Sequence, residues 1–590
     1  MTTRIADTTA RGGGWLTEDT DASTVFTPEQ LTEEHRLIAQ TATEFIDTEV
    51  EPATHRLEQK DWALARTLVQ RCGELGLLGT DVPEALGGVG LDKVCSVLVG
   101  EAVGRNASFA TTFGAQTGLA ITPLLCFGSP EQQQKYLPRL VSGEIVGAYA
   151  LSESASGSDA LGARARATKQ GDGSYLLTGE KMWITNGGFS DLYIVFAKVD
   201  GEQFTAFIVE RSFPGVSTGK EEHKMGLHGS STTPLILQDA RVPAENVLGE
   251  VGKGHKVAFN VLNYGRFKLA AMCSGGAKLA VGEAARYADD RRQFGQPLST
   301  FGAIRHKLSE MSIREYAIES MLYRTAGLID AVLQGSHESD RILAALEEFA
   351  IEASILKVAS SEMIDFVLDE NVQVHGGNGF VSDYPAERHY RDARVNRIFE
   401  GTNEINRMLI PGMLAKRAVK GTLPIIAAAR KLQEEIMSPS LPEPSSGEPF
   451  EAERRAVGAM KKTGLMVVGT AMQNYGAQLA EQQEVLLIAA DIIMDTYAAE
   501  SVLIRASNLP RASSESAAVH EAAARVFIND AAGRVEIAAR TALAAMTEGD
   551  TLRTMLAALR RILKVTPVNT VGLRRTVADA VTSSKGYPFA

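Results

Sequence analysis

His375–Arg407 reads HGGNGFVSDYPAERHYRDARVNRIFEGTNEINR, and it carries the strongest signal in this 590-residue chain. The stretch combines a diglycine turn, a basic helical segment and one acid, Glu400, which stands between Ile398-Phe399 and Gly401-Thr402. A carboxylate between an apolar pair and a glycine can occupy a dry pocket while the backbone approaches a ligand closely. Removal from water there raises the pKa of the carboxyl group and makes it a stronger base. The Glu-Gly-Thr triplet alone is more often a surface glutamate at a helix end, so the context of the whole stretch decides its interpretation.

The composition excludes several classes of function. The chain has 60 Lys and Arg against 72 Asp and Glu, a formal net charge of −12. This charge disfavours a nucleic-acid partner, because phosphate contacts require a basic face. The four cysteines are scattered without a C-x-x-C pair, which indicates a reducing compartment and no zinc or other metal site. The N-terminus lacks an apolar signal region, and no run of 18 apolar residues is present, so we expect a cytoplasmic protein without a membrane span rather than one of the mitochondrial matrix.

The composition and apolar periodicity of the sequence change five times along the chain. Helical periodicity gives way to short β-branched and aromatic runs near Tyr149, and returns near Lys256. The run SPSLPEPSSGEP at 438–449 contains four prolines and no apolar period, which is typical of a linker. The predicted organisation is a disordered N-terminus (1–27), a helical domain (28–148), a β domain (149–255), a helical bundle (256–420), a linker (421–451) and an extra helical domain (452–590).

The 375–407 stretch resembles the C-terminal signature of the acyl-CoA dehydrogenases, in which the glutamate of such a Phe-Glu-Gly-Thr run is the catalytic base. The resemblance covers about residues 30–415. It implies a multidomain α+β fold with an N-terminal helical domain, a middle β-barrel-like domain and a C-terminal four-helix bundle. The extra helical domain is similar to the extension of the very-long-chain members, in the run Glu481–Ser507 and in the proline-aromatic tail.

The cofactor implied by this resemblance is FAD. The segment YALSESASGSD (149–159) could be an ordinary serine-rich loop, KMWITNGG (181–188) could supply a core tryptophan, and RRQFGQPL (291–298) could be a solvated helix end. The strand pleat places Trp183 and Thr185 on one face, where an indole can stack on a flavin. The family usually has Thr-Glu-Pro where this chain has Ser152-Glu153-Ser154, so loop rigidity is in question. Carried over residue by residue, the FAD-binding set is Tyr149, Leu151, Ser152, Gly157, Ser158, Trp183, Thr185, Arg291, Phe294, Gln373, Gly376, Gly377, Thr402 and Glu404.

The resemblance also implies at least a dimer, because Arg291, Phe294, Gln373, Gly376 and Gly377 match residues that reach the neighbouring subunit's FAD. We expect a homodimer rather than the tetramer common among the short members, because the extra helical domain should cover the surface that they use for a second dimer contact. No G-x-G-x-x-G opens a βαβ unit, so a nicotinamide cofactor is not implied.

The implied reaction is α,β-dehydrogenation of long-chain acyl-CoA to trans-2-enoyl-CoA in fatty-acid β-oxidation. Glu400 removes the α-proton, and the β-hydride passes to the flavin. The electrons then pass to an electron-transfer flavoprotein. An acyl-CoA oxidase that uses oxygen, and a dehydrogenase-like scaffold protein with little catalysis, remain alternatives. The implied substrate-binding residues are Ser158, Leu262, Asn263, Arg266, Phe399 and Gly401, with Arg266 as a cation near Glu400.

Two further segments carry predictions of their own. The resemblance implies that Thr111–Leu125 is a helix that lines the tail pocket, where Gly114, Ala115, Gly118 and Ala120 would leave a deep slot; close helix packing at the glycines is the alternative. Residues 454–468, RRAVGAMKKTGLMVV, combine basic and apolar side chains, and we expect either peripheral membrane contact or an ordinary packed helix.

Overall fold

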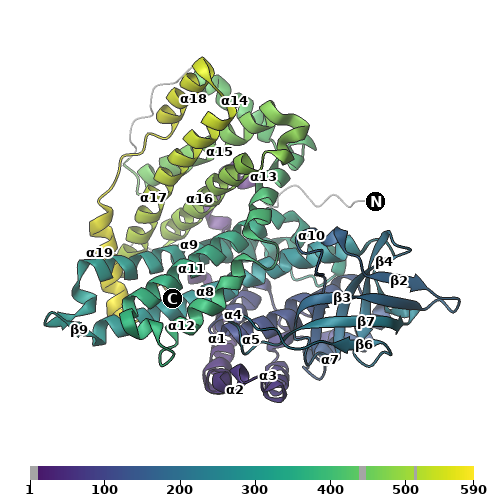
Figure 1. The fold of residues 1–590 in the computed structure, drawn as a ribbon. Helices are drawn as coiled ribbons and strands as arrows, with labels where there is room; N and C mark the ends of the chain where they lie inside the picture. The colour runs from purple at the N-terminus through teal and green to yellow at the C-terminus, as the bar shows by residue number, and fades with distance from the viewer. Residues whose placement is uncertain (1–10, 438–446, 510–514, 590) are drawn as a thin grey trace.

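The computed structural model describes residues 11–437, 447–509 and 515–589, and four blocks follow one another along the chain (Figure 1). A helical block is followed by a sheet domain, a bundle of long helices and a second helical block. The sheet domain lies at one side of the molecule, and the last block lies on the far side of the bundle (Figure 1).

The first block consists of short helices, five of which begin with a side-chain cap. Asp92 and Asn106 accept hydrogen bonds from backbone N–H groups in the first turns of two of them. The helices are α1 (Glu33–Phe45), α2 (Thr54–Glu58), α3 (Trp62–Glu74), α4 (Lys93–Gly104), α5 (Ala107–Gly114), α6 (Thr122–Phe127) and α7 (Pro130–Val141). A π-helical segment, Ala115–Ile121, joins α5 to α6, so the helix expected over Thr111–Leu125 is interrupted. Wide turns of this kind are frequent at functional sites.

The middle block is an eight-stranded sheet. Its order is β6-β7-β3-β2-β4-β5-β8, with β1 paired to β4 off this path. Most pairs are antiparallel, and β1 and β2 run parallel to β4. The strands are β1 (Gly147–Ala150), β2 (Arg166–Lys169), β3 (Tyr175–Thr185), β4 (Leu192–Val199), β5 (Gln203–Glu210), β6 (Val216–Thr218), β7 (Thr232–Val242) and β8 (Val247–Leu248). Strand β4 is apolar and almost wholly buried, as expected for a central strand covered on both faces.

The third block is built on four long helices that pack side by side. They are α8 (Gly254–Asp290), α9 (Gly302–Leu333), α11 (Ala350–His375) and α13 (Asn403–Val419). The shorter α10 (Ser339–Glu348), α12 (Ala386–Ala393) and the hairpin β9 (Arg292–Gln293) and β10 (Gln296–Pro297) complete it. Helices α4 and α8 touch through their backbones. A Cβ on Gly275 would lie 1.7 Å from the Glu101 carbonyl oxygen, and one on Gly104 would lie 2.1 Å from that of Met272.

The last block is wholly helical and packs on the bundle through α13 and α9. Its helices are α14 (Ile425–Met437), α15 (Glu451–Tyr475), α16 (Gln483–Asn508), α17 (Glu515–Met546), α18 (Gly549–Ile562) and α19 (Thr570–Ser584). The chain end returns to the bundle: the Tyr587 hydroxyl donates to Glu319 Oε2 at 2.7 Å, and the buried Phe589 ring lies 4.5 Å from that of Tyr316.

The prediction of disorder over residues 1–27 is wrong for the part that the structure describes. From residue 11 onward the segment is folded, and its Trp15 packs between α11 and α16. The Trp15 indole donates to Glu352 Oε1 at 3.0 Å, and its ring lies 4.8 Å from that of Tyr497. A Cβ on Gly12 would lie 2.0 Å from the Glu348 carbonyl oxygen. The glycines that suggested disorder allow close packing of the backbone. Residues 1–10 lie outside the described residues.

The predicted linker 421–451 is also corrected. Helix α14 occupies residues 425–437, packs on α15 and α13, and has Ile425 and Leu432 buried. The first prolines of the run at 438–449 fall at 438–446, outside the described residues. Ala428 and Leu432 belong to the apolar core, so this segment is part of the folded domain rather than a spacer.

The membrane-contact prediction for residues 454–468 fails, because these residues form the middle of α15 and their apolar side chains are internal. Leu465, Met466, Val467 and Val468 are buried, and Lys461 pairs with Glu500 at 2.5 Å inside the block. The segment therefore presents no apolar face to a lipid headgroup layer. Among the described residues, no helix is both long and apolar enough to cross a bilayer.

Candidate active site

Glu400 lies in the short connection that enters α13, and its backbone is held in an unusual conformation. Its φ is 57° and that of Gly401 is 80°, so two successive residues are left-handed. This conformation is strained for a glutamate by about 1 kcal/mol or more, and such strain is concentrated at functional sites. The carboxylate lies against Gly265 of α8, where a Cβ would come within 2.8 Å of Glu400 Oε2. Gly265 therefore makes the space that the carboxylate occupies.

The carboxyl group of Glu400 is prepared to act as a base near neutral pH. Its Oε2 atom is buried and has no hydrogen-bond partner among the described residues. Burial raises the pKa of Glu400 to about 7, against the opposing positive charges of Arg266 and Lys357. A carboxyl with this pKa is largely ionised above pH 7 and still basic enough to remove a proton from carbon.

Arg266 is the predicted cation, and the structure places it against the backbone of Glu400. Its Nε donates to the Glu400 carbonyl oxygen at 3.1 Å, and its Nη1 donates to Asn263 Oδ1 at 3.0 Å. Burial lowers the pKa of Arg266 to about 10. The guanidinium thus holds the strained turn and also favours the ionised carboxylate. Phe399 and Gly401 of the predicted substrate-binding set flank Glu400 in the chain, and Phe399 lines the cavity described below. Leu262 is half-buried on α8 and is not among the residues that line this cavity.

Lys357 of α11 is a second cation that the sequence did not reveal. Its buried ammonium donates to Asn403 Oδ1 at 2.7 Å, in the first turn of α13. Burial lowers the pKa of Lys357 to about 8, and the nearby carboxylate of Glu400 opposes this shift. The residue lies 43 positions before Glu400 in an otherwise ordinary helix, so no local motif marks it.

An apolar cavity opens from the Glu400 carboxylate. It has a volume of about 110 Å³, and its wall joins the first block, the sheet and the bundle. Gly114, Ala115 and Gly118 line it, as predicted, whereas Ala120 does not: Ala120 is buried against Gly147 of β1. The opposite wall is one stripe of α8 that contributes Gly265, Lys268, Leu269, Met272, Cys273, Gly276 and Leu279.

Two of the predicted cofactor residues of the sheet domain, Tyr149 and Thr185, lie near Glu400. Thr185 lines the cavity that contains the Glu400 carboxylate. The Tyr149 hydroxyl is buried without a hydrogen-bond partner among the described residues, and burial, with the charge of Glu400, raises its pKa. Leu151 and Ser152 follow it, and the Ser152 carbonyl oxygen accepts from the Met182 N–H at 2.9 Å. Gly157 and Ser158 are exposed in the following loop, and a Cβ on Gly157 would meet nothing within 4 Å.

Trp183 is turned outward by a bulge in β3. The register with β7 shifts between Lys181 and Ile184, and Trp183 has a φ of 58° and a 58% exposed side chain. The sequence had suggested that strand alternation places Trp183 and Thr185 on one face. Because of the bulge, alternation does not determine the direction of the Trp183 side chain. A large indole held in the left-handed region and left open is a suitable surface for stacking on a planar ring.

The two predicted cofactor residues that follow Glu400 lie at the start of α13. Thr402 is the N-cap of α13, and Glu404 is exposed in its first turn.

The remaining predicted cofactor residues form a separate group at the other end of the bundle. The hairpin of β9 and β10 lies at the opposite side of the molecule from the sheet (Figure 1). Phe294 at the tip of this hairpin is 94% exposed, and Arg291 before it is exposed too. Gln373, Gly376 and Gly377 lie at the end of α11, which the Tyr287–His375 ring stack at 4.2 Å ties to the end of α8. A Cβ on either glycine would meet nothing within 4 Å.

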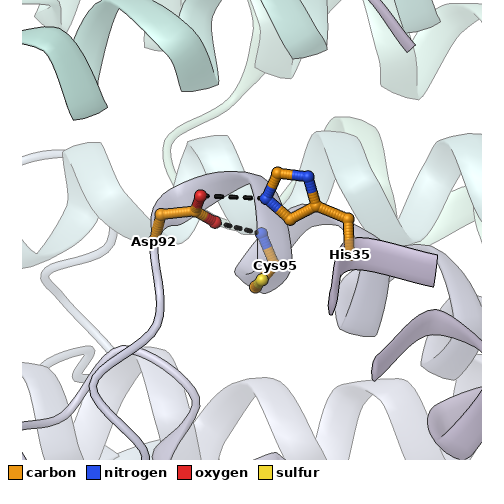
Figure 2. A group of neighbouring side chains, drawn as sticks. All are labelled: His35, Asp92 and Cys95. Carbon is orange, nitrogen blue, oxygen red and sulfur yellow. Dashed lines mark hydrogen bonds and ion pairs between the residues drawn. The ribbon is translucent and has the colours of Figure 1, made fainter. Parts of the chain in front are cut away.

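A cluster of potential metal ligands elsewhere is explained by helix capping. Figure 2 shows His35, Asp92 and Cys95 with their polar atoms close together. The Thr32 N–H donates to His35 Nδ1 at 3.2 Å, so the neutral ring carries its proton on Nε2 and donates it to Asp92 Oδ2 at 2.9 Å. Asp92 Oδ1 accepts from the Cys95 N–H at 2.8 Å as the cap of α4, and burial raises the pKa of the Cys95 thiol. These groups fasten α1 to α4.

Comparison with known proteins identifies the family. Models of the acyl-CoA dehydrogenase N-terminal, middle and C-terminal domains match residues 32–144, 148–240 and 252–414, and a further C-terminal domain model matches 459–561. A probable acyl-CoA dehydrogenase from Bacillus subtilis is 46% identical over 594 residues, covering 100% of both chains. The chain belongs to the acyl-CoA dehydrogenase family.

Two further relatives extend this result. A crystal structure of acyl-CoA dehydrogenase complexed with FAD from Bacillus anthracis superposes with a TM-score of 0.96 at 46% identity, covering 98% of this chain and 100% of that one. The mitochondrial very long-chain specific acyl-CoA dehydrogenase from Macaca fascicularis is 40% identical over 393 residues, which is 63% of this chain and 58% of that relative. The expected four-part architecture, including the additional C-terminal helical domain, is confirmed.

Membership of the family makes this chain an acyl-CoA dehydrogenase that uses FAD. The residues present fit that cofactor. The open indole of Trp183, the unpartnered Tyr149 hydroxyl and the uncrowded Gly376 and Gly377 provide a stacking surface, a polar contact and room for close backbone approach.

Proposed function

We propose that this enzyme dehydrogenates long-chain acyl-CoA thioesters at Cα and Cβ and passes the electrons to an electron-transfer flavoprotein. The observation that carries the proposal is the unpartnered Glu400 carboxylate at the mouth of an apolar cavity whose wall runs along α8. A dry base and a long apolar slot in one cavity suit a substrate with an acidic α-proton and an alkyl tail.

The base and its surroundings account for proton removal. The Glu400 carboxylate takes the α-proton, and the space left by Gly265 lets it approach the substrate. The backbone N–H of Glu400 has no acceptor among the described residues, so it is available to donate to the thioester oxygen while negative charge develops there. The contact of Arg266 with the Glu400 carbonyl keeps this N–H and the carboxylate in one fixed geometry. When bound, FAD would supply the acceptor for the β-hydride, and Thr185, which lines the same cavity as Glu400, would be among the residues that hold it.

The shape of the cavity supports long acyl chains. The α8 stripe extends from Gly265 to Leu279, and the 14 helical rises between them give a length of about 21 Å. An extended alkyl chain with C–C bonds of ~1.5 Å advances roughly 1.3 Å per carbon, so this wall matches about 16 carbons.

The glycines on the facing wall distinguish a slot from close helix packing. A Cβ on Gly118 would lie 3.9 Å from Lys268 Cδ, and one on Gly114 would lie 3.3 Å from Met272 Cε. Both neighbours are ends of flexible side chains rather than backbone, in contrast to Gly104 and Gly275. The small residues therefore widen the cavity, which favours the slot.

The separation of the cofactor residues supports a homodimer. Thr185 and Tyr149 of the sheet domain lie near Glu400. The β9–β10 hairpin, which belongs to the other group, lies on the opposite side of the molecule from the sheet (Figure 1). Both groups can contact one FAD only if the second comes from a neighbouring copy. Phe294, the most exposed of the large apolar side chains in the described residues, would then be covered.

Turnover of a graded panel of acyl-CoAs, from four to twenty carbons, tests the proposed function. We expect bleaching of the bound flavin with kcat/KM largest at twelve carbons or more, and electron transfer to an electron-transfer flavoprotein. The reduced, product-bound flavin should survive in air, because rapid reoxidation by oxygen would identify an oxidase. A maximum at butyryl-CoA would refute the long-chain assignment, and no bleaching with any acyl-CoA would favour a scaffold role.

A further inference from the structure

Lys268 places a cation in the wall of the acyl cavity. It lies on α8 one turn after Gly265, and its side chain is only 7% exposed. No hydrogen bond or ion pair to its ammonium is found in the described parts of the chain. Its Nζ instead lies 4.9 Å from the ring centre of Tyr264 and 6.0 Å from that of Phe113. A buried ammonium with three N–H donors and no acceptor is costly, so its presence calls for an explanation.

The charges behind Lys268 do not satisfy it. Asp81 is the nearest carboxylate that acts on it, but that group pairs with Lys93 at 2.5 Å and also accepts from the Tyr264 hydroxyl. Lys93 is a second cation on the same side and repels Lys268. Asp330 accepts from the backbone N–H groups of Lys93 and Val94 and is not among the charges that act on Lys268. The set holds two ammonium groups around one fully engaged carboxylate, and burial lowers the pKa of Lys268 to about 8.

The cavity in front of Lys268 is lined by Gly118, Leu269 and Met272, and elsewhere by the polar side chains of Arg105, His389, Asp392, Asn396 and Glu400. Among the described residues, none of these polar groups makes a hydrogen bond or ion pair with Lys268. Gly118 stands opposite, where even an added Cβ would reach only van der Waals contact with Lys268 Cδ at 3.9 Å. Leu269 and Met272 continue the wall beyond it, so the ammonium lies partway along the cavity rather than at its mouth. A purely saturated tail would pass the cation without offering it an acceptor.

We propose that Lys268 binds an oxygen carried by the acyl chain, so that acyl-CoAs with a carboxylate or hydroxyl several carbons beyond the thioester are substrates of this enzyme. An anionic or hydroxyl oxygen of the substrate would be the hydrogen-bond acceptor that Lys268 lacks among the described residues. The Lys268 ammonium would donate a charge-assisted hydrogen bond to it in a site shielded from water. This inference rests on the proposed acyl-CoA dehydrogenase function and names a substrate class for the same cavity.

The test compares three series of acyl-CoAs with the FAD-loaded enzyme: saturated chains, ω-carboxyacyl chains and hydroxyacyl chains, each of graded length. For the wild type, we expect kcat/KM for at least one oxygen-bearing series to peak at a chain length that places the oxygen beside Lys268. Lys268→Met should lower kcat/KM for that substrate, relative to the saturated chain of equal length, by about 10- to 100-fold, the effect of losing a hydrogen bond to a charged group. Lys268→Arg should retain most of the preference.

Lys256→Met, which makes the same substitution at an exposed lysine of α8 outside the cavity wall, is the matched control and should leave the ratio nearly unchanged. An unaltered ratio in Lys268→Met, with saturated chains still turned over, overturns this inference and leaves the proposed function standing. Absence of turnover with every saturated chain in the wild type overturns the proposed function instead. If Lys268→Met does not fold, the wild-type panel decides alone: oxygen-bearing substrates without any length optimum overturn the inference.

Discussion

Gly118→Leu should shorten the acyl chains that the enzyme accepts. Gly118 lies on the π-helical segment after α5 and faces the cavity, opposite Lys268. Its backbone is not left-handed, so a side chain is tolerated there, and leucine is a better helix former than glycine. The new isobutyl group has four carbons, and it should occupy the space of about four methylenes of a long tail.

The magnitude follows from the burial of those methylenes. Each is worth about 0.8 kcal/mol, so excluding four costs ~3 kcal/mol, or roughly 200-fold in kcat/KM for a sixteen-carbon substrate. Gly118→Ala, with one added carbon, should cost about 4-fold by the same rule. Substrates too short to reach Gly118 should be unaffected.

The assay is flavin bleaching and steady-state turnover for hexadecanoyl-CoA and for a short chain on wild type, Gly118→Ala and Gly118→Leu. The ratio of the two kcat/KM values should fall in the order of side-chain size. Melting temperatures of the three FAD-loaded proteins verify that the fold is intact. A ratio that stays constant across the series, in proteins of equal stability, would refute the placement of the tail beside Gly118.

Three other predictions concern the base, its electrostatics and the assembly. Glu400→Gln should retain FAD and the fold but lose at least ~10²-fold in flavin bleaching by acyl-CoA; near wild-type bleaching would exclude Glu400 as the base. In the wild type, kcat/KM should rise with pH through about 7 as Glu400 ionises, and Lys357→Met should move this limb to higher pH, because a positive charge that favours the carboxylate is removed; an unmoved limb in a folded variant would show that Lys357 does not act on the base. Light scattering should give about twice the chain mass of 63.3 kDa, and Phe294→Asp should weaken FAD retention; a mass near four chains, or full retention by the variant, would contradict the proposed dimer.

Much of this protein could be read from local sequence because local chemistry determines it. The order of helical and β blocks follows from apolar periodicity. Around Glu400 the signal is equally local, because an acid is followed by Gly401 and then by Thr402, which caps the next helix. Glycines and caps act through bonds to near neighbours in the chain, so their signals survive without a tertiary structure.

What the tertiary structure alone decided depends on contacts between distant segments. Glycines near the N-terminus suggested disorder, yet Gly12 packs against the backbone of Glu348, and the basic, apolar run in α15 proved to be core. Neither the cation Lys357 near the base nor the unpartnered Lys268 in the acyl cavity is marked by a motif. Burial and the charges that face a residue are sums over the whole fold, whereas a sequence window contains only one of the segments that contribute to them. The sequence by itself therefore determined the block order and singled out Glu400 as the proposed base, and packing across α4, α8 and α11 determined the pKa of its carboxyl group and the cavity beside it.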